Sequence, residues 1–241
     1  MDIEVWSDVG CPWSYVGRAH LLEALDSPRV RAIGQVAVRW RAFELLPELA
    51  AVYDGSFADR LRREYDWTDD QVVAYEQDLA AQAAAVGGRF RFDILRMANT
   101  FDAHRLIALA GTRGLAGRVK QRLADAYFGE GLIVSDREVL EGLAVEAGLE
   151  PMEVRAALES GAFAEQVRDD ERRAKRLGIT QAPTFLIDET ILLVGAQPTD
   201  ALIDAILDAA QGSRADGDVG VRDLSEALPP ARSCTAESCI V

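Results

Sequence analysis

The sequence contains few of the residues on which cross-links and metal sites depend. Its 241 residues include three cysteines, Cys11, Cys234 and Cys239, and two histidines, His20 and His104. Three thiols cannot form the dense disulfide framework of a small secreted protein. Only Cys234 and Cys239 are closely spaced, and no histidine lies near them in the sequence, so a zinc site is not expected. We therefore treat the cysteines as candidates for chemistry.

Long apolar runs and excess positive charge are also missing. No run reaches the roughly 18–20 apolar residues that a membrane helix needs. No basic segment followed by an apolar one indicates a secretion signal, so we expect a cytoplasmic protein. The 40 acidic residues outnumber the 26 basic ones, and the formal net charge is −14. This charge argues against nucleic acid or an anionic membrane as a partner.

The hydrophobic periodicity divides the chain into two mixed segments that flank a helical one. A strand over residues 3–7, a helix from Pro12 to about residue 25 and a strand over 36–43 are predicted first. From about residue 56 to 177 the pattern is helical throughout, with capping-box sequences at 68–71 and 135–138. The charged run 169–173 is typical of a solvent-exposed helix face. A hairpin of strands 184–188 and 191–194 and a helix from Pro198 follow.

This order predicts an α/β fold of the form β-α-β … β-β-α, interrupted by about 120 helical residues. We assign residues 1–50 and 178–212, with a helix at about 163–177, to the α/β domain. Residues 51–162 are the predicted inserted, all-helical subdomain. Residues 213–241 are rich in Gly, Asp, Arg, Ser and Pro and are predicted to be a flexible C-terminal tail with a Cys-x4-Cys motif.

Cys11 stands where the first predicted helix begins, because Pro12 suits the first helical position. A thiolate is the nucleophilic form of cysteine, and a free cysteine has a pKa of about 8.5. The unpaired N–H groups and the dipole of the first helical turn favour the thiolate. We expect the amides of Trp13 and Ser14 and the Ser14 hydroxyl to be donors, and Cys11 to be accessible with a lowered pKa. The alternative is a buried cysteine that acts as a small apolar residue.

The segment Ser7–Gly17, centred on Cys11-Pro12-Trp13-Ser14, resembles the active-site segment of DsbA-like oxidoreductases of the thioredoxin fold. It is most similar to the FrnE-like branch, which is related to 2-hydroxychromene-2-carboxylate isomerase and kappa-class glutathione transferase. Three further segments carry the resemblance. Asn99–Arg105 resembles the helix start that overlies the active site in this branch. Gly178–Phe185 resembles the loop with the cis-proline, and Cys234–Cys239 resembles the C-terminal cysteine pair.

The resemblance implies a thioredoxin fold and a set of residues around Cys11. It implies that Pro183 is cis and that the backbone of Ala182 pairs with an extended substrate. The residues that would line the site are Pro12, Trp13, Ala182, Pro183, Asn99 and His104. We expect Trp13 to be an exposed apolar contact for substrate, with a role in the core as the alternative. For His104 the alternative is ordinary packing.

This chain departs from the family at Ser14, where the usual motif has a second cysteine. Serine cannot close an intramolecular disulfide, so Cys11 would form a mixed disulfide that another thiol must resolve. Candidates are a small thiol such as glutathione or mycothiol, a partner protein, or Cys234 and Cys239 as an accessory redox pair. Alternatively, Cys234 and Cys239 form an inert local disulfide or are exposed thiols.

Three functions are consistent with these features. The first is thiol-disulfide exchange, as an oxidoreductase or isomerase of protein disulfides, with Cys11 as nucleophile and Ser14 as its partner. The second is a thiol-dependent isomerase or transferase of the 2-hydroxychromene-2-carboxylate isomerase type. The third is a binding or chaperone-like module that has no redox activity, because Ser14 takes the place of the second cysteine. We expect no tightly bound cofactor, a protein or small-thiol substrate, and a monomer or homodimer.

Overall fold

The computed structural model describes residues 1–212, 221–224 and 232–235. The chain divides into two compact units, Met1–Leu45 with Asp169–Val241, and Leu46–Arg168. The helical unit therefore extends beyond the block 51–162 at both ends. Within the described residues, no helix combines the length and the apolar composition needed to span a lipid bilayer.

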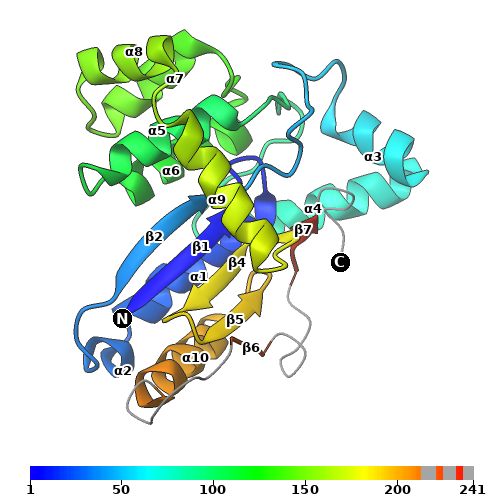
Figure 1. The fold of residues 1–241 in the computed structure, drawn as a ribbon. Coiled ribbons are helices and arrows are strands. Elements are labelled where there is room, and N and C mark those ends of the chain that lie inside the picture. Colours follow the sequence, from blue (N-terminus) through cyan, green and yellow to red (C-terminus); the bar gives the residue numbers. More distant parts are fainter. Residues whose placement is uncertain (213–220, 225–231, 236–241) are drawn as a thin grey trace. The chain divides into compact units, whose positions relative to one another are not determined.

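The first unit is built on a five-stranded sheet with the strand order β2-β1-β4-β5-β6 (Figure 1). Strand β1 pairs in parallel with β2 and antiparallel with β4. Strand β4 pairs antiparallel with β5, and β5 pairs in parallel with β6. The expected β-α-β … β-β-α order is confirmed. The strands are β1 Asp2–Ser7, β2 Ala37–Ala42, β4 Thr184–Ile187, β5 Ile191–Val194 and β6 Arg222–Asp223.

Helices cover both faces of this sheet. Side chains alternate along β1, so Ile3 and Val5 face one side and Trp6 faces the other. Ile3 and Val5 pack in a core with residues of α1 (Pro12–Asp26), α2 (Pro28–Arg31) and α10 (Thr199–Gly212). Trp6 packs with Leu186 and with Ala174 of α9 (Ala164–Arg176), whose residues from Asp169 onward belong to this unit. The first unit thus has a three-layer arrangement.

The hairpin between β4 and β5 turns one residue earlier than expected. Strand β4 ends at Ile187, and Asp188 and Glu189 form the turn with positive φ angles of 48° and 57°. The N–H of Thr190 donates to the carbonyl of Ile187 at 3.0 Å and closes the turn. Two central residues with positive φ are the signature of the type I′ turn, whose twist matches that of the strands.

The second unit is helical, with two differences from the predicted pattern. The capping box at Thr68 is confirmed, but the one at Ser135 is wrong: Asp136 caps the helix and accepts the N–H groups of Glu138 and Val139. Residues 86–100 form no regular helix. The helices are α3 Phe57–Tyr65, α4 Asp69–Ala85, α5 Phe101–Gly111, α6 Ala116–Asp125, the π-helical turn η1 Ala126–Glu130, α7 Arg137–Glu146 and α8 Pro151–Ser160.

The segment expected to be a flexible tail contributes two short strands. Strand β6 extends the main sheet, and β7 (Cys234–Thr235) pairs antiparallel with β3 (Gln181–Ala182) in a separate two-stranded sheet. For these residues the prediction of a flexible tail is wrong. The physical reason is that β5 and β3 have edges whose main-chain groups accept another strand.

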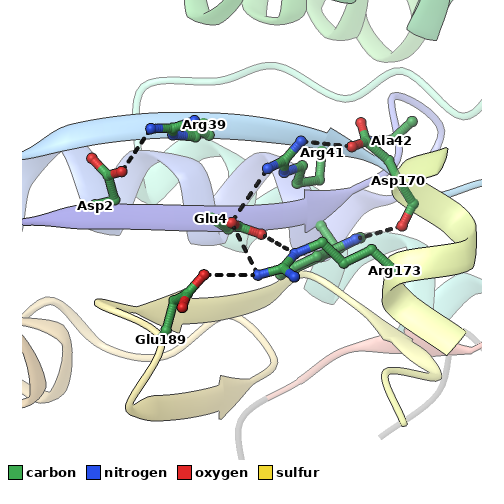
Figure 2. Close-up of polar contacts among 9 residues, drawn as sticks. Asp2, Glu4, Arg39, Arg41, Ala42, Asp170, Arg173 and Glu189 are labelled. Carbon is green, nitrogen blue, oxygen red and sulfur yellow. Dashed lines mark hydrogen bonds and ion pairs between the residues drawn. The ribbon is translucent and has the colours of Figure 1, made fainter. Parts of the chain in front are cut away.

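A group of ion pairs joins β1, β2 and α9 (Figure 2). Glu4 on β1 lies between Arg41 of β2 and Arg173 of α9, with N···O distances of 3.3 and 2.8 Å. Burial opposes ionisation of Glu4, but the two guanidinium groups outweigh it and hold the pKa of Glu4 below its usual value. Asp170 accepts Arg41 at 2.8 Å and the N–H of Ala42 at 3.1 Å. The run 169–173 is therefore not uniformly exposed.

We predict that Asp170→Ala destabilises the protein far more than Asp169→Ala. Asp170 is 5% exposed, and its loss leaves Arg41 and the Ala42 N–H without this acceptor, at a cost of about 3–5 kcal/mol. Among the described residues, the neighbouring Asp169 makes only an exposed ion pair with Arg172, so its loss costs about 0.5 kcal/mol. Urea unfolding measures both. Equal midpoints for the two variants would contradict the prediction.

Candidate active site

Cys11 lies at the N-terminus of α1, three residues beyond the loop residue Asp8 that follows β1. It is the N-cap residue, with an extended backbone (φ −95°, ψ 116°), and Pro12 is the first helical residue. The Ser14 N–H donates to the Cys11 sulfur at 3.3 Å. Capping by a side-chain acceptor satisfies an amide that the helix itself leaves unpaired. The structure thus brings the sulfur to the predicted position at the helix start.

The loop before β4 brings Ala182 and Pro183 to the same place. The Cys11 thiol donates to the Ala182 carbonyl with an S···O distance of 3.5 Å, and the Ala182–Pro183 peptide bond is cis. Gly17 on α1 allows this approach: a Cβ atom there would lie 2.9 Å from Cγ of Pro183. Real Cβ contacts are essentially never so short. Sequence reasoning missed Gly17, since a glycine inside a helix signals only reduced helix propensity.

The environment of the sulfur differs from the expected accessible thiolate. Cys11 is 0% exposed, and burial raises the pKa of its thiol to about 12. The hydroxyl and amide of Ser14 and the amide of Trp13 act in the opposite direction, and the negative charge of Asp8 adds to the rise. The expectation of an accessible, low-pKa thiol is therefore wrong for this arrangement, because desolvation disfavours the charged form more than these donors favour it.

Asp8 is a site residue that sequence reasoning missed. It is buried, and its carboxylate accepts the N–H of Leu45 at 2.7 Å and that of Gly10 at 3.2 Å. Its own N–H donates to the Ser14 hydroxyl oxygen at 3.3 Å. These bonds join the loop after β1, the chain after β2 and the first turn of α1. An acidic residue directly after an apolar strand was the available signal, but such residues are also common in exposed loops.

Trp13 is buried, contrary to the expected exposed contact. It is 2% exposed, and the guanidinium of Arg232 lies over its ring, 5.1 Å from the centroid. Among the residues that the structure describes, none accepts a hydrogen bond from the Trp13 indole nitrogen. The neighbouring Pro12 is also buried. Trp13 therefore lies beneath a residue of the C-terminal segment.

The remaining predicted residues are divided between the two units. Asn99 and His104 belong to the second unit: the Asn99 side-chain oxygen accepts the N–H of Phe101 at 2.9 Å, and His104 is buried. Cys234 is buried, forms a disulfide and pairs with Ala182 in the β3–β7 ladder. Cys239 lies outside the described residues. The roles predicted for these residues stay predictions. In the parts of the chain that the structure describes, no cluster of potential ligands could hold a metal ion.

Comparison with known proteins identifies relatives that cover most of the chain. The model of the DSBA-like thioredoxin domain matches residues 2–207. A crystal structure of a probable DsbA oxidoreductase from Streptomyces coelicolor is 38% identical, with a TM-score of 0.83 over 90% of this chain and 93% of that one. The cytosolic disulfide reductase DsbM from Pseudomonas aeruginosa, solved with GSH, is 22% identical (TM-score 0.56, 89% and 98% covered). A 2-hydroxychromene-2-carboxylate isomerase is 18% identical (TM-score 0.57, 89% and 96% covered). At identities of 22% and 18%, the last two comparisons show a shared fold.

We predict that Asp8→Asn and Ser14→Ala move the pKa of Cys11 in opposite directions. Asp8→Asn keeps an acceptor oxygen for one of the two N–H groups, Leu45 or Gly10, but removes a negative charge that raises the pKa, so the pKa falls. Ser14→Ala removes a hydroxyl that lowers it, so the pKa rises. Below the pKa, each unit of decrease raises the thiolate fraction about tenfold.

The measurement is the rate of Cys11 alkylation against pH, followed by mass spectrometry of the peptide that contains Cys11. Shifts of both variants in the same direction would contradict the electrostatic assignment.

Proposed function

The chain belongs to the family of DSBA-like thioredoxin domains, and from this premise we propose that it exchanges thiols and disulfides through Cys11 alone. The family contains thiol oxidoreductases and has isomerase relatives of the same fold. The observation that carries the proposal is the placement of the Cys11 sulfur between the Ser14 amide at the start of α1 and the Ala182 carbonyl beside the cis-proline. Catalytic sulfur at a helix N-terminus is stabilised as thiolate once it is solvated.

The exchange proceeds in two balanced steps. The Cys11 thiolate attacks one sulfur of a substrate disulfide, so a Cys11–substrate disulfide forms, the original S–S bond breaks and the second substrate sulfur leaves as a thiolate. A further thiolate then attacks the substrate sulfur of the mixed disulfide, so a disulfide between that thiol and the substrate forms, the Cys11–substrate bond breaks and Cys11 leaves as a thiolate. The Ser14 amide and hydroxyl stabilise the charge on Cys11 in both steps, first as nucleophile and then as leaving group.

The second step needs a thiol from outside the four-residue motif, because Ser14 has none. A small thiol such as glutathione or mycothiol is one proposed source, in line with the DsbM structure that contains GSH. Cys234 is the other: it forms a disulfide and lies opposite Ala182, the residue whose carbonyl the Cys11 thiol contacts. In its reduced form, with Cys239, it would supply the resolving thiolate. We propose a cytoplasmic location, where such thiols are kept reduced.

We predict that Cys11→Ser abolishes mixed-disulfide formation with a disulfide-bonded peptide, whereas Ser14→Cys shortens its lifetime. The introduced thiol would lie next to the Cys11 sulfur and would resolve the adduct internally, releasing the peptide and forming an intramolecular disulfide with Cys11. Ser14→Ala is the matched control, since it changes the same side chain but supplies no thiol.

Acid quenching and mass spectrometry follow the adduct over time. An adduct that forms equally in Cys11→Ser would refute the proposal. Turnover of an electrophile with bound small thiol, without any adduct on a peptide, would favour an isomerase of the 2-hydroxychromene-2-carboxylate type.

A further inference from the structure

The C-terminal segment Arg232–Thr235 lies against the loop that carries the cis-proline. Its last two residues form β7, in which Cys234 is opposite Ala182 and Thr235 is opposite Gln181. The carbonyl of Ala182 is also the acceptor of the Cys11 thiol. The segment therefore covers the main chain directly beside the buried sulfur. Both belong to the first unit.

Two polar contacts hold the part of the segment that precedes β7. The N–H of Ala196 donates to the carbonyl of Arg232 at 2.7 Å. The hydroxyl of Ser233 donates to the side-chain oxygen of Gln181. With the β3–β7 ladder, these contacts hold all four residues of the segment in place. Main-chain pairing of this kind accepts many sequences, because it depends little on side chains.

A further contact of the segment is made by the side chain of Arg232. The guanidinium of Arg232 lies over the ring of Trp13, two residues after Cys11, at 5.1 Å from the ring centroid. Tryptophan is the aromatic residue that attracts cations most strongly. The chain as a whole has a net charge of −14, which also favours a basic ligand. The pairing of Arg232 with Trp13 therefore depends on the arginine side chain, whereas the main-chain contacts do not depend on which side chains are present.

We propose that β3, Ala196 and Trp13 form a binding site for an extended polypeptide with arginine two residues before the residue opposite Ala182, and that Arg232–Thr235 occupy this site as an internal ligand. The inference rests on the proposed function, since it names the substrate class as polypeptides with Arg-x-Cys rather than small disulfides. The internal segment competes with such substrates and keeps Cys11 covered while it is bound.

The competition has a measurable consequence for Cys11. If alkylation requires release of the segment, the alkylation rate follows the small fraction of molecules in which the segment is released. Loss of a cation–π contact at a partly exposed site raises that fraction about 2- to 5-fold. The whole-molecule fold is unaffected, because Arg232 is itself exposed.

The first test compares two arginines of the C-terminal region in the full-length chain. We expect Arg232→Ala to speed Cys11 alkylation about 2- to 5-fold at fixed pH. Arg222→Ala is the matched control: it removes another exposed arginine, from β6, whose ion pair is with Asp208 at 3.0 Å. We expect it to leave the rate unchanged. Equal rates for the two variants would overturn the proposal of an internal ligand.

The second test supplies the segment in trans. The probe is a fluorescein-labelled copy of residues 229–238 with Cys234→Ser, which cannot form a covalent bond opposite Ala182. We expect it to bind full-length Arg232→Ala about 2- to 5-fold more tightly than the wild type, because the competing segment is weaker. A peptide that also has Arg232→Ala binds more weakly by a similar factor, and Trp13→Phe in the protein reduces that difference. Equal binding of both peptides would overturn the arginine selectivity.

These outcomes are separate from those that test the redox function. Peptide binding needs no thiol chemistry, so it is expected to persist in Cys11→Ser. Selective peptide binding without an adduct at Cys11 would support the binding site and refute the proposed redox activity. Adducts that form at Cys11 with no preference for arginine, and at a rate independent of Arg232, would support the redox activity and refute this inference.

Discussion

The pairing of β1 on both sides is the constraint from which the candidate site follows. Because β2 and β4 are both bonded to it, the end of β1 has a fixed position, and the loop that leads to Cys11 begins there. The face of β1 that meets α9 carries Glu4 and Trp6. They attach this helix through Arg173 and through the bond from the Trp6 indole to the Asp170 carbonyl at 3.0 Å. The same strand therefore connects the polar cluster in Figure 2 with the helix start at the sulfur.

At the sulfur, two general effects oppose each other, and their magnitudes decide the outcome. A helix terminus stabilises a nearby charge by about 0.3–1 kcal/mol, or up to about 2 kcal/mol when partly buried, which corresponds to about 1.5 pKa units at most. Full desolvation shifts a pKa by up to about 3–5 units. The raised pKa of the buried Cys11 follows from this difference. Helix geometry alone therefore does not produce a thiolate; water must also reach the sulfur.

The limits of sequence prediction have the same physical origin. Local signals were sufficient for α1, where Pro12 marks the first turn, and for α4, where Thr68 and Gln71 form a capping box. They could not show that Asp170 is buried whereas Asp169 is exposed. Adjacent charged residues on a helix give the same sequence pattern, and only packing against the sheet buries one of them. They also could not predict β7, because two residues pair with β3 only once a distant loop presents its edge. Contacts between residues far apart in the sequence, through burial for Asp170 and through strand pairing for β7, decided both cases.

Burial and the missing second thiol have one joint consequence. In a motif with two cysteines, the resolving sulfur lies beside the nucleophilic one. The second cysteine can then resolve the mixed disulfide even when no thiol from outside can reach the site. With Ser14 in that place, the mixed disulfide of the proposed exchange would persist on Cys11 until another thiol reached it. The edge of Ala182 borders the sulfur, so whatever covers that edge limits the entry of the substrate and of the resolving thiol alike. In the exchange that we propose, access to this short strand therefore limits both steps.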